Sequence, residues 1–539
     1  MLGHPPAPGR RRAAVLFTAS VALTAAVLGA GPAAARTQST AAAVSNADVT
    51  LTMSDGTGLS GILTEPGTPG PHPAIVFIAS WATPDFEYAA QAQQFAEDGY
   101  VVLEYEARGF YTSGGTVDVA SPQDVADVST VIDWLIANTP TNPNEIGVGG
   151  ISYGAGLALL AAAHDPRIKA TASLSAWTDL DYSLYPNGTR HYESTAMLQA
   201  LAEITGRLSP DLQQQLGDFF ADQDVSEVLA WGAVRSPQTY LDQINAHGTA
   251  VFISNNLQDS IFAPNQIAAF YDGLTTPKYL MFQPGDHATA EATGLLGLPN
   301  QIWASAHAWF DHYLTGAANG INTQQPVQIE QVGGSGYTGY PSLAAAAPKS
   351  GVVTLGGQNR LGYGSLGPSP AGSWKTQIDV GTDTCADGGT VEITGILTQF
   401  LDAPPSCWLP AVDHGDGAVW QSGALSSAER VRGEPTLDLT VTPSASSGTF
   451  FAYLYDVNWL DDGSLISYVP YSYSGATPGK PLTISVPMQY AAYDVPAGDS
   501  LGLVIDTKDP LFLDQDQAGS TLAFSGSGSA PSTVTLPLG

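Results

Sequence analysis

Basic residues are scarce in this chain of 539 residues. Lys and Arg together number 18 against 50 Asp and Glu, which gives a formal net charge of −32. A surface of this sign repels the phosphate backbone of nucleic acids and the headgroups of anionic lipids. We therefore expect no nucleic-acid partner.

Cysteine is nearly absent, and the common metal-binding motifs are missing. Cys385 and Cys407 both lie in the C-terminal half. A disulfide between them would close a loop of about twenty residues and contribute roughly 3 kcal/mol in an oxidising compartment; two free thiols are the alternative. The sequence contains no HExxH or CxxC motif, and its nine histidines are scattered. It therefore predicts neither a metal nor a cofactor.

The first 35 residues have the three parts of a secretory signal peptide. Arg10, Arg11 and Arg12 precede an apolar run over residues 13–30, and small residues follow up to Ala35. About twenty apolar residues can also form an uncleaved membrane anchor, but the alanine-rich composition and the A-x-A ending favour cleavage. Cleavage would remove three Arg and no acidic residue, so the formal charge would move from −32 to −35. We expect an exported protein without stable membrane insertion.

Residues 48–320 alternate between short apolar runs and longer helical stretches. VTLTM and GLSGILTE predict an opening hairpin around Asp55-Gly56. Six predicted strands then follow, separated by helical segments: PAIVFIAS, YVVLEYE, EIGVGG, IKATASLSA, TAVFISN and KYLMFQ. Apolar runs without alternation indicate buried parallel strands. The pattern therefore predicts a parallel sheet with helices on both faces.

Two segments depart from this alternation. Residues 178–245 are mainly helical, so we expect a cap over the carboxyl ends of the strands. From about residue 320, short strands such as PVQIEQV, TLDLTVT and DSLGLVID predict an antiparallel sandwich over residues 321–539. The expected order is a signal peptide (1–35), an α/β domain (48–320) and an all-β domain (321–539).

The segment GVGGISYGAG contains the strongest candidate for a nucleophile. Ser152 lies between Gly150 and Gly154, directly after a predicted strand and before a predicted helix. A strand-to-helix turn this sharp forces its central residue into a strained conformation, and tiny neighbours let the helix close against the sheet. The G-x-S-x-G motif in this context predicts a nucleophilic serine of the α/β-hydrolase fold, with a structural turn serine as the alternative.

A serine nucleophile of this kind requires an acid and then a histidine, each on a loop after a later strand. Asp259 follows the strand TAVFISN, and His287 follows the strand KYLMFQ. We therefore predict that Ser152, Asp259 and His287 form a catalytic triad. Asp286 adjoins the histidine and is expected to face solvent.

The remaining candidates fit the triad less well. His307 and His312 lie inside a helix, His164 ends the helix after the nucleophile, and His247 precedes its strand. The oxyanion of the tetrahedral intermediate needs two further donors. We predict the backbone N–H of Tyr153 and that of Trp81, which lies in the loop after the strand PAIVFIAS.

The order of motifs resembles that of a known family. The chain resembles the Xaa-Pro dipeptidyl-peptidase and cocaine esterase family of serine hydrolases in six segments. These are EARGFYTSGG, GISYG, QDSIFAPNQ and PGDH, and in the tail VRGEPTLDLTVT and YDVPAGDSLGLVID. The resemblance implies an α/β-hydrolase domain with a helical cap, a C-terminal jelly-roll domain, and the same triad. It also implies a structural salt bridge at Arg108, although Glu106 replaces the family's usual Asp. Ser80-Trp81-Ala82 stands where the esterase branch has an oxyanion-hole tyrosine, so that tyrosine is not carried over.

These features predict a cofactor-independent serine hydrolase of small peptide or ester substrates. From the family resemblance, release of Xaa-Pro dipeptides is the first candidate activity, and hydrolysis of small acyl esters is the second. Asp85, Glu87 and Glu193 are candidates for holding a peptide's N-terminal ammonium, although solvated surface carboxylates are the simpler interpretation. An apolar, aromatic acyl pocket would favour the esterase.

A different class of function is also open. The chain could be a binding protein for carbohydrate or a cell-wall polymer if Trp408, Trp420 and Trp459 formed an exposed flat platform. Core packing is the expected fate of these aromatic side chains.

Overall fold

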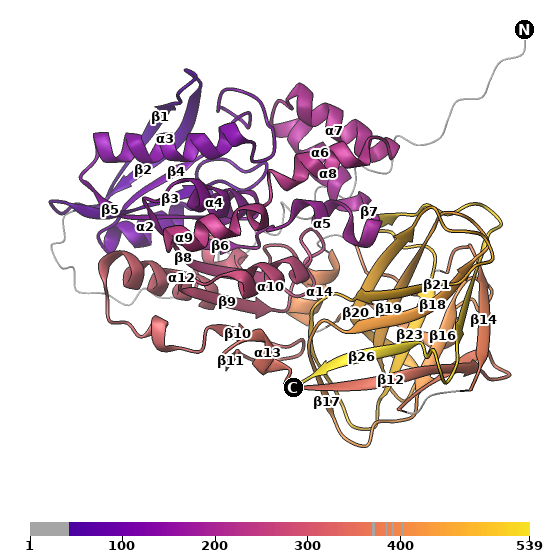
Figure 1. The fold of residues 1–539 in the computed structure, drawn as a ribbon. Helices are drawn as coiled ribbons and strands as arrows, with labels where there is room; N and C mark the ends of the chain where they lie inside the picture. The colour runs from indigo at the N-terminus through magenta and orange to yellow at the C-terminus, as the bar shows by residue number, and fades with distance from the viewer. Residues whose placement is uncertain (1–42, 369–371, 384, 391–392, 402) are drawn as a thin grey trace, which may run out of the picture. The chain divides into compact units, whose positions relative to one another are not determined.

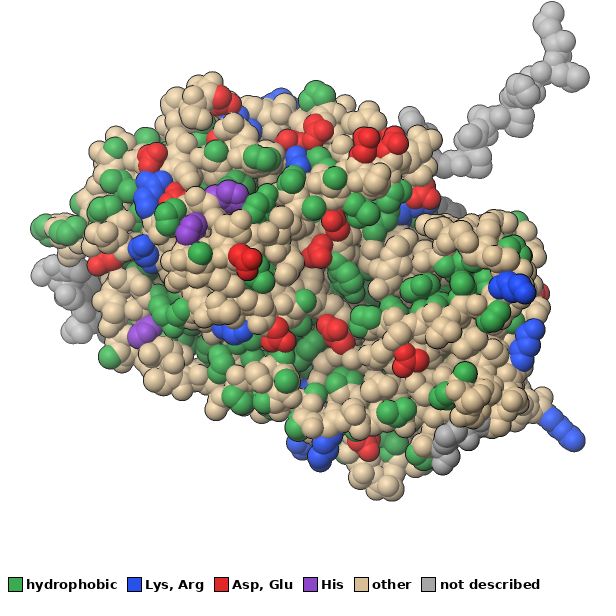
Figure 2. Space-filling view, viewed as in Figure 1, with side chains coloured by type: hydrophobic (Ala, Val, Ile, Leu, Met, Phe, Trp, Pro, Cys, Tyr) green, Lys and Arg blue, Asp and Glu red, His purple; other side chains and the backbone are tan. Residues whose placement is uncertain are grey.

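The computed structural model describes residues 43–539 except 369–371, 384, 391–392 and 402. The predicted signal peptide lies outside the described residues. Among the residues described, no helix is both long enough and apolar enough to span a bilayer. The face drawn in Figure 2 carries acidic side chains that are scattered over the surface.

A ten-stranded mixed sheet forms the frame of the N-terminal domain. Its central pairings, from β4 through β3, β5, β6, β8 and β9 to β10, are parallel, whereas β1–β2, β2–β4 and β10–β11 are antiparallel. In sheet order the strands are β1 (Ser45–Thr52), β2 (Gly58–Glu65), β4 (Val101–Tyr105), β3 (His72–Ile78), β5 (Thr141–Ile151), β6 (Ile168–Leu174), β8 (Ala250–Asn256), β9 (Lys278–Gln283), β10 (Val327–Ile329) and β11 (Thr338–Tyr340).

Helices cover both faces of this sheet because successive residues of its strands point to opposite sides. Val76 and Ile78 of β3 pack in a core with α3 (Pro122–Asn138) and α4 (Tyr153–His164). Ile75 and Phe77 instead pack with α2 (Ala89–Glu97) and α12 (Gln301–Phe310). The helices α9 (Leu241–His247) and α10 (Pro264–Gly273) extend the layer that contains α4. The predicted fold class is confirmed.

A group of helices is inserted between β6 and β8. It comprises α5 (Leu180–Leu184), α6 (Tyr192–Thr205), α7 (Pro210–Ala221) and α8 (Val225–Ala233). Figure 1 shows α6, α7 and α8 gathered together. We call α5–α8 the cap, because their side chains line a cavity above Ser152.

The expected place of one strand is wrong. PVQIEQV was expected in the all-β tail, but Val327–Ile329 pairs in parallel with β9, and β11 pairs with it in turn. The first sheet therefore extends to Tyr340. The three-residue strand has no α/β repeat around it, so its pattern alone does not distinguish it from a sandwich strand.

The C-terminal domain is rich in β-strands, and nearly all of its strand pairs are antiparallel. The predicted strands TLDLTVT and DSLGLVID are confirmed as parts of β18 and β23. In the described part of the domain, its large sheet contains fourteen strands: β12 (Lys349–Gln358), β13 (Tyr363–Gly367), β14 (Trp374–Asp379), β15 (Ser406–Trp408), β16 (Ala418–Ser422), β17 (Glu429–Gly433), β18 (Thr436–Pro443), β19 (Gly448–Val457), β20 (Asp462–Tyr473), β21 (Leu482–Pro487), β22 (Ala491–Val495), β23 (Ser500–Asp506), β25 (Thr521–Gly526) and β26 (Thr533–Leu538).

This domain also has a short helix and contacts with the α/β domain. Helix α14 (Ile393–Leu401) was not predicted. The two-residue strand β24 (Phe512–Leu513) pairs with β7 (Arg190–His191), directly before α6 of the cap. Asn265 of α10 donates to the backbone carbonyl of Met488 at 2.9 Å.

Candidate active site

Ser152 occupies the tight turn between β5 and α4. Its φ of 55° and ψ of −115° place a non-glycine residue in a strained region of backbone space. A Cβ at Gly150 would lie 2.7 Å from the carbonyl oxygen of Ile78, and one at Gly154 would collide with the same oxygen. The glycines therefore allow the helix to approach β3 closely, and the turn presents the Ser152 side chain at the end of the strand.

The three predicted catalytic side chains meet in one hydrogen-bonded line. Ser152 Oγ lies 2.7 Å from His287 Nε2, and His287 Nδ1 lies 3.0 Å from Asp259 Oδ2. All three residues are buried. The aspartate can hold the imidazole in the orientation in which Nε2 accepts the serine proton.

Asp259 is fixed by its own loop. Its second oxygen, Oδ1, accepts hydrogen bonds from the backbone N–H groups of Ile261 at 3.0 Å and Phe262 at 2.7 Å. The carboxylate therefore has donors on both oxygens, which fix its position.

Asp286 contradicts the expectation that it faces solvent. The residue is 1% exposed. Its Oδ1 accepts from Ser260 N, Ser260 Oγ and His287 N, each at 2.7 Å. Burial, and then the nearby charge of Asp259, raise the pKa of Asp286 to about 6. Asp286 thus joins the loop of the acid to the loop of the base.

A third buried carboxylate, Glu291, lies close to the His287 loop. Glu291 Oε1 accepts from Ser175 Oγ and Ser254 Oγ, both at 3.1 Å. Asn256 Nδ2 donates to the backbone carbonyl of Asp286 at 2.6 Å and to Glu291 Oε2 at 3.3 Å. Burial raises the pKa of Glu291. This network was not predicted from the sequence. The sequence signal for it is the position of Ser175, Ser254 and Asn256 near the carboxyl ends of two strands.

The predicted oxyanion donors lie beside the nucleophile. Trp81 lies in the loop after β3, and its indole is 5.3 Å from the ring of Tyr153. In the described part of the chain, neither backbone N–H of these two residues donates to an acceptor. Both groups are therefore available to a substrate oxygen.

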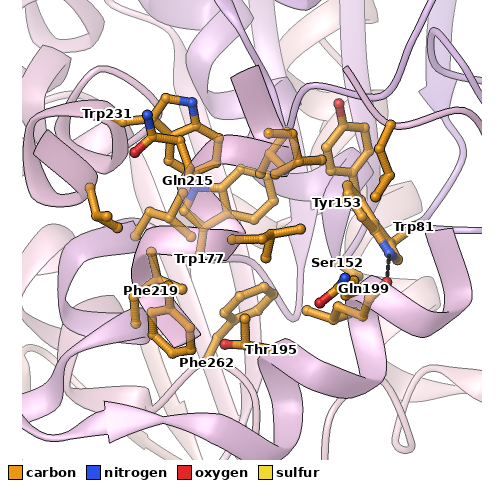
Figure 3. A pocket seen from close by; sticks show the side chains of 18 residues that line it. Trp81, Ser152, Tyr153, Trp177, Thr195, Gln199, Gln215, Phe219, Trp231 and Phe262 are labelled. Carbon is orange, nitrogen blue, oxygen red and sulfur yellow. Dashed lines mark hydrogen bonds between the residues drawn. The ribbon is translucent and has the colours of Figure 1, made fainter. Parts of the chain in front are cut away.

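The loop that carries Trp81 is held from below by Glu87. This carboxylate accepts from Ser80 N at 2.7 Å and from Ser80 Oγ at 2.6 Å. Trp81 Nε1 donates to the backbone carbonyl of Leu198 at 2.9 Å, which ties the loop to α6 of the cap (Figure 3). Burial raises the pKa of Glu87. Glu87 is partly buried, and its hydrogen bonds to Ser80 give it a structural role.

A cavity of about 100 Å³ opens directly onto Ser152 under the cap. Figure 3 shows aromatic rings surrounding it. None of the described residues that line it is Asp, Glu, Lys, Arg or His. The lining residues are Trp81, Val119, Ser152, Tyr153, Trp177, Leu180, Leu184, Thr195, Leu198, Gln199, Leu208, Leu212, Gln215, Leu216, Phe219, Val228, Trp231 and Phe262. We call this cavity the acyl pocket.

The three carboxylates considered for binding an ammonium group lie outside this pocket. Glu87 holds the Trp81 loop, and Asp85 accepts from Ser60 Oγ at 2.7 Å. Glu193 lies in the first turn of α6, where its backbone N–H donates to the carbonyl of Leu511 at 3.1 Å. None of them lines the cavity at Ser152.

Other candidate residues lie outside the catalytic line. The imidazole of His307 stacks on Phe95 with ring centroids 3.5 Å apart, and His164 Nδ1 lies 2.8 Å from the carbonyl of Leu160. Likewise, His247 Nδ1 lies 2.9 Å from the carbonyl of Ala162, and His312 Nδ1 lies 2.9 Å from that of Ala317.

Arg108 forms the structural ion pairs that the family resemblance implied. Its guanidinium contacts Asp127 and Asp55, each at 2.8 Å. Glu106 is not its partner, because that carboxylate accepts from the backbone N–H groups of Thr112 and Ser113.

The C-terminal domain contains the disulfide and the three tryptophans. Cys385 and Cys407 are joined by a disulfide. Trp420 is fully buried, as expected, whereas Trp408 and Trp459 are 56% and 84% exposed. The expectation of core packing is therefore wrong for Trp408 and Trp459. The burial of Trp420 excludes an exposed platform made from all three tryptophans.

The strained serine, the hydrogen-bonded triad and the α/β frame define a serine hydrolase of the α/β-hydrolase type. Residues 55–289 match the model of the X-Pro dipeptidyl-peptidase (S15 family), and residues 319–536 match that of the X-Pro dipeptidyl-peptidase C-terminal non-catalytic domain. The chain belongs to this S15 family of hydrolases.

Several known proteins are similar to this chain at low identity. The Xaa-Pro dipeptidyl-peptidase of Lacticaseibacillus casei is 22% identical over 78% of this chain and 62% of its own length. A solved CocE/NonD family hydrolase from Staphylococcus aureus has a TM-score of 0.72 and 13% identity, with 91% of this chain and 92% of that chain covered. An α-amino acid ester hydrolase has a TM-score of 0.66 and 17% identity, with 96% and 100% covered. These structures share the fold.

Proposed function

We propose that this protein is an exported serine esterase that hydrolyses esters of apolar acyl groups through an acyl-enzyme on Ser152. The observation that carries this proposal is the acyl pocket, which opens onto Ser152 and has no charged lining residue. Apolar and aromatic walls favour an apolar acyl group, because its burial removes hydrocarbon surface from water.

The geometry supports a two-step acyl transfer. Ser152 Oγ attacks the ester carbonyl while His287 Nε2 accepts the hydroxyl proton, and Asp259 stabilises the imidazolium that forms. The N–H groups of Tyr153 and Trp81 stabilise the oxyanion. When the C–O bond to the alcohol breaks, His287 returns the proton to the leaving oxygen. Water, activated by the same histidine, then releases the acid from Ser152.

Release of Xaa-Pro dipeptides is the second candidate, and the family match supports it. An Xaa-Pro substrate carries an N-terminal ammonium into the site. Burial of that charge without a partner is costly, and the acyl pocket has no carboxylate to pair with it. The sequence placed the peptidase before the esterase, and the apolar pocket reverses this order.

Initial rates on two substrate panels test the proposal. One panel contains Xaa-Pro chromogenic amides and the other contains p-nitrophenyl esters of apolar acids. We expect wild type and the control Ser350→Ala, a change at an exposed serine of β12, to hydrolyse the esters, and Ser152→Ala to lose this activity. Mass spectrometry of an ester reaction stopped early should detect the acyl group on the peptide that contains Ser152. Faster turnover of the amides than of the esters would contradict the esterase.

Export is supported by the Arg-rich start, the apolar run and the alanine cluster of residues 1–35. The disulfide also suits an oxidising compartment. Expression of the full chain in a secreting bacterial host should deliver to the medium a protein that begins after Ala35. N-terminal sequencing checks this, and a cell-bound protein that retains residues 1–35 would contradict it.

A further inference from the structure

The outer surface of the cap carries a groove beside helices α6 and α7. The groove has a volume of about 510 Å³, and its lining includes Gln199, Glu203, Leu208, Gln213, Leu216 and Phe220. Three of these residues, Gln199, Leu208 and Leu216, also line the acyl pocket. One layer of side chains therefore separates the pocket from the groove at this point.

Of these three side chains, Gln199 alone has a described hydrogen bond, and its partner lies on the same helix. Gln199 Nε2 donates to Glu203 Oε1 at 2.7 Å, so its amide is held on the groove side by a partner on its own helix. Leu208 and Leu216 are only partly buried. Between residues 196–203 of α6 and 212–219 of α7, all of which are described, no hydrogen bond crosses from one helix to the other.

Other parts of the pocket wall are held by hydrogen bonds. Trp177 Nε1 donates to the carbonyl of Arg235 at 2.8 Å, and Trp231 Nε1 donates to Asp211 at 2.8 Å. Thr195 Oγ1 donates to the carbonyl of His191 at 2.7 Å. Displacement of Leu216 breaks no such bond, so the wall between α6 and α7 can open at Leu216 without the loss of a side-chain hydrogen bond.

The size of the pocket makes this opening relevant to the substrate. A cavity of ~150 Å³ takes up one benzene molecule, so the acyl pocket, at about 100 Å³, holds only a short acyl group. We propose that Gln199, Leu208 and Leu216 form a gate through which a longer linear acyl chain extends from the pocket into the groove. The inferred substrates are esters of medium- and long-chain fatty acids. This inference rests on the esterase function proposed above.

The acyl-chain preference of gate variants tests the proposal. We would measure kcat/KM for p-nitrophenyl esters from acetyl to decanoyl, below their solubility limits. Leu216→Trp should fill the gate and lower the ratio of kcat/KM for the decanoyl ester to kcat/KM for the acetyl ester at least tenfold. Leu361→Trp, at an exposed leucine of the C-terminal domain, is the matched control and should change neither value. If Leu216→Trp fails to fold, Leu216→Ala should raise the decanoyl-to-acetyl ratio above that of wild type.

The outcomes separate the two proposals. If wild type hydrolyses acetyl and butyryl esters but not decanoyl esters, the gate is wrong and the esterase stands. An unchanged chain-length profile in both Leu216 variants would also overturn the gate. If wild type hydrolyses none of the esters, the proposed esterase itself is wrong.

Discussion

Buried carboxylates occur in both domains, but their surroundings differ. In the catalytic centre, Asp259 and Asp286 each accept several hydrogen bonds from backbone N–H groups and side chains. In the C-terminal domain, Asp506 at the end of β23 is fully buried, and neither of its oxygens has a hydrogen-bond partner in the described part of the chain. Burial, and then the charges of Asp509 and Asp383, raise the pKa of Asp506 well above its ordinary value.

The two groups of carboxylates therefore have different roles. Asp259 and Asp286 position the catalytic side chains, whereas a charge on Asp506 only lowers the stability of the fold. The donors around Asp259 and Asp286 belong to the loops that carry the catalytic residues, so each hydrogen bond also fixes the triad. At Asp506 the backbone N–H of Lys508 lowers the pKa only in part, and among the residues described neither carboxylate oxygen has a partner within hydrogen-bond geometry, so burial favours the protonated form. Substitutions in the first group should therefore change activity, and those in the second should change stability.

The largest effect is expected from Asp259→Asn. The amide keeps the shape of the side chain but cannot stabilise the imidazolium or hold the required tautomer of His287, so kcat should fall about 10⁴-fold. The free energy of unfolding should change by far less than the activation free energy that this loss of kcat represents. Steady-state kinetics with p-nitrophenyl butyrate checks this, with Asp242→Asn at an exposed position of α9 as the control. A loss smaller than tenfold would remove Asp259 from the triad.

The disulfide should affect stability without affecting catalysis. Cys385 lies two residues from both Asp383 and Asp387, and its bond to Cys407 spans 22 residues. Replacement of both cysteines by Ser should lower the free energy of unfolding by about 3 kcal/mol, because the unfolded chain gains freedom. Denaturant unfolding measures the loss, and kcat/KM at 25 °C should stay within twofold of wild type. Equal stability of the two proteins would contradict this expectation.

Asp506→Asn should stabilise the protein at neutral pH. Because the pKa of Asp506 is raised in the folded state, folded protein binds more protons than unfolded protein above pH ~4, and wild-type stability falls as the pH rises. The variant lacks this titration, so its advantage over wild type should grow from pH 4 to pH 8. Thermal unfolding over this range checks the trend, with Asp462→Asn at an exposed position as the control. A wild type that is more stable than the variant at pH 8 would show that Asp506 has a partner.

The sequence predicted the triad more readily than its surroundings. Ser152, Asp259 and His287 each follow a strand whose apolar run is visible in the sequence, and parallel strands bring such loops to one edge of the sheet. The burial of Asp286 was not predictable, because it depends on how two loops meet through Ser260 and Asp286, which are 26 residues apart. The apolar pocket was also hidden, since it is built from side chains of four cap helices that no periodicity places above the nucleophile.

Asp286→Asn should lower kcat much less than Asp259→Asn does. This variant tests whether Asp286 supports His287 through its hydrogen bonds or through its charge. The amide oxygen can still accept from Ser260 and His287, so kcat should fall less than tenfold. In wild type the pKa of about 6 lies above the ordinary 3.8, so stability is lost as the pH rises through this window. The stability of the variant relative to wild type should therefore increase by roughly 2 kcal/mol between pH 4 and pH 7. Denaturant unfolding at these two pH values measures the change. Asp286→Ala removes the acceptor as well and should lower kcat further; if both variants lose the same activity, the charge of Asp286 and not its hydrogen bonds supports His287.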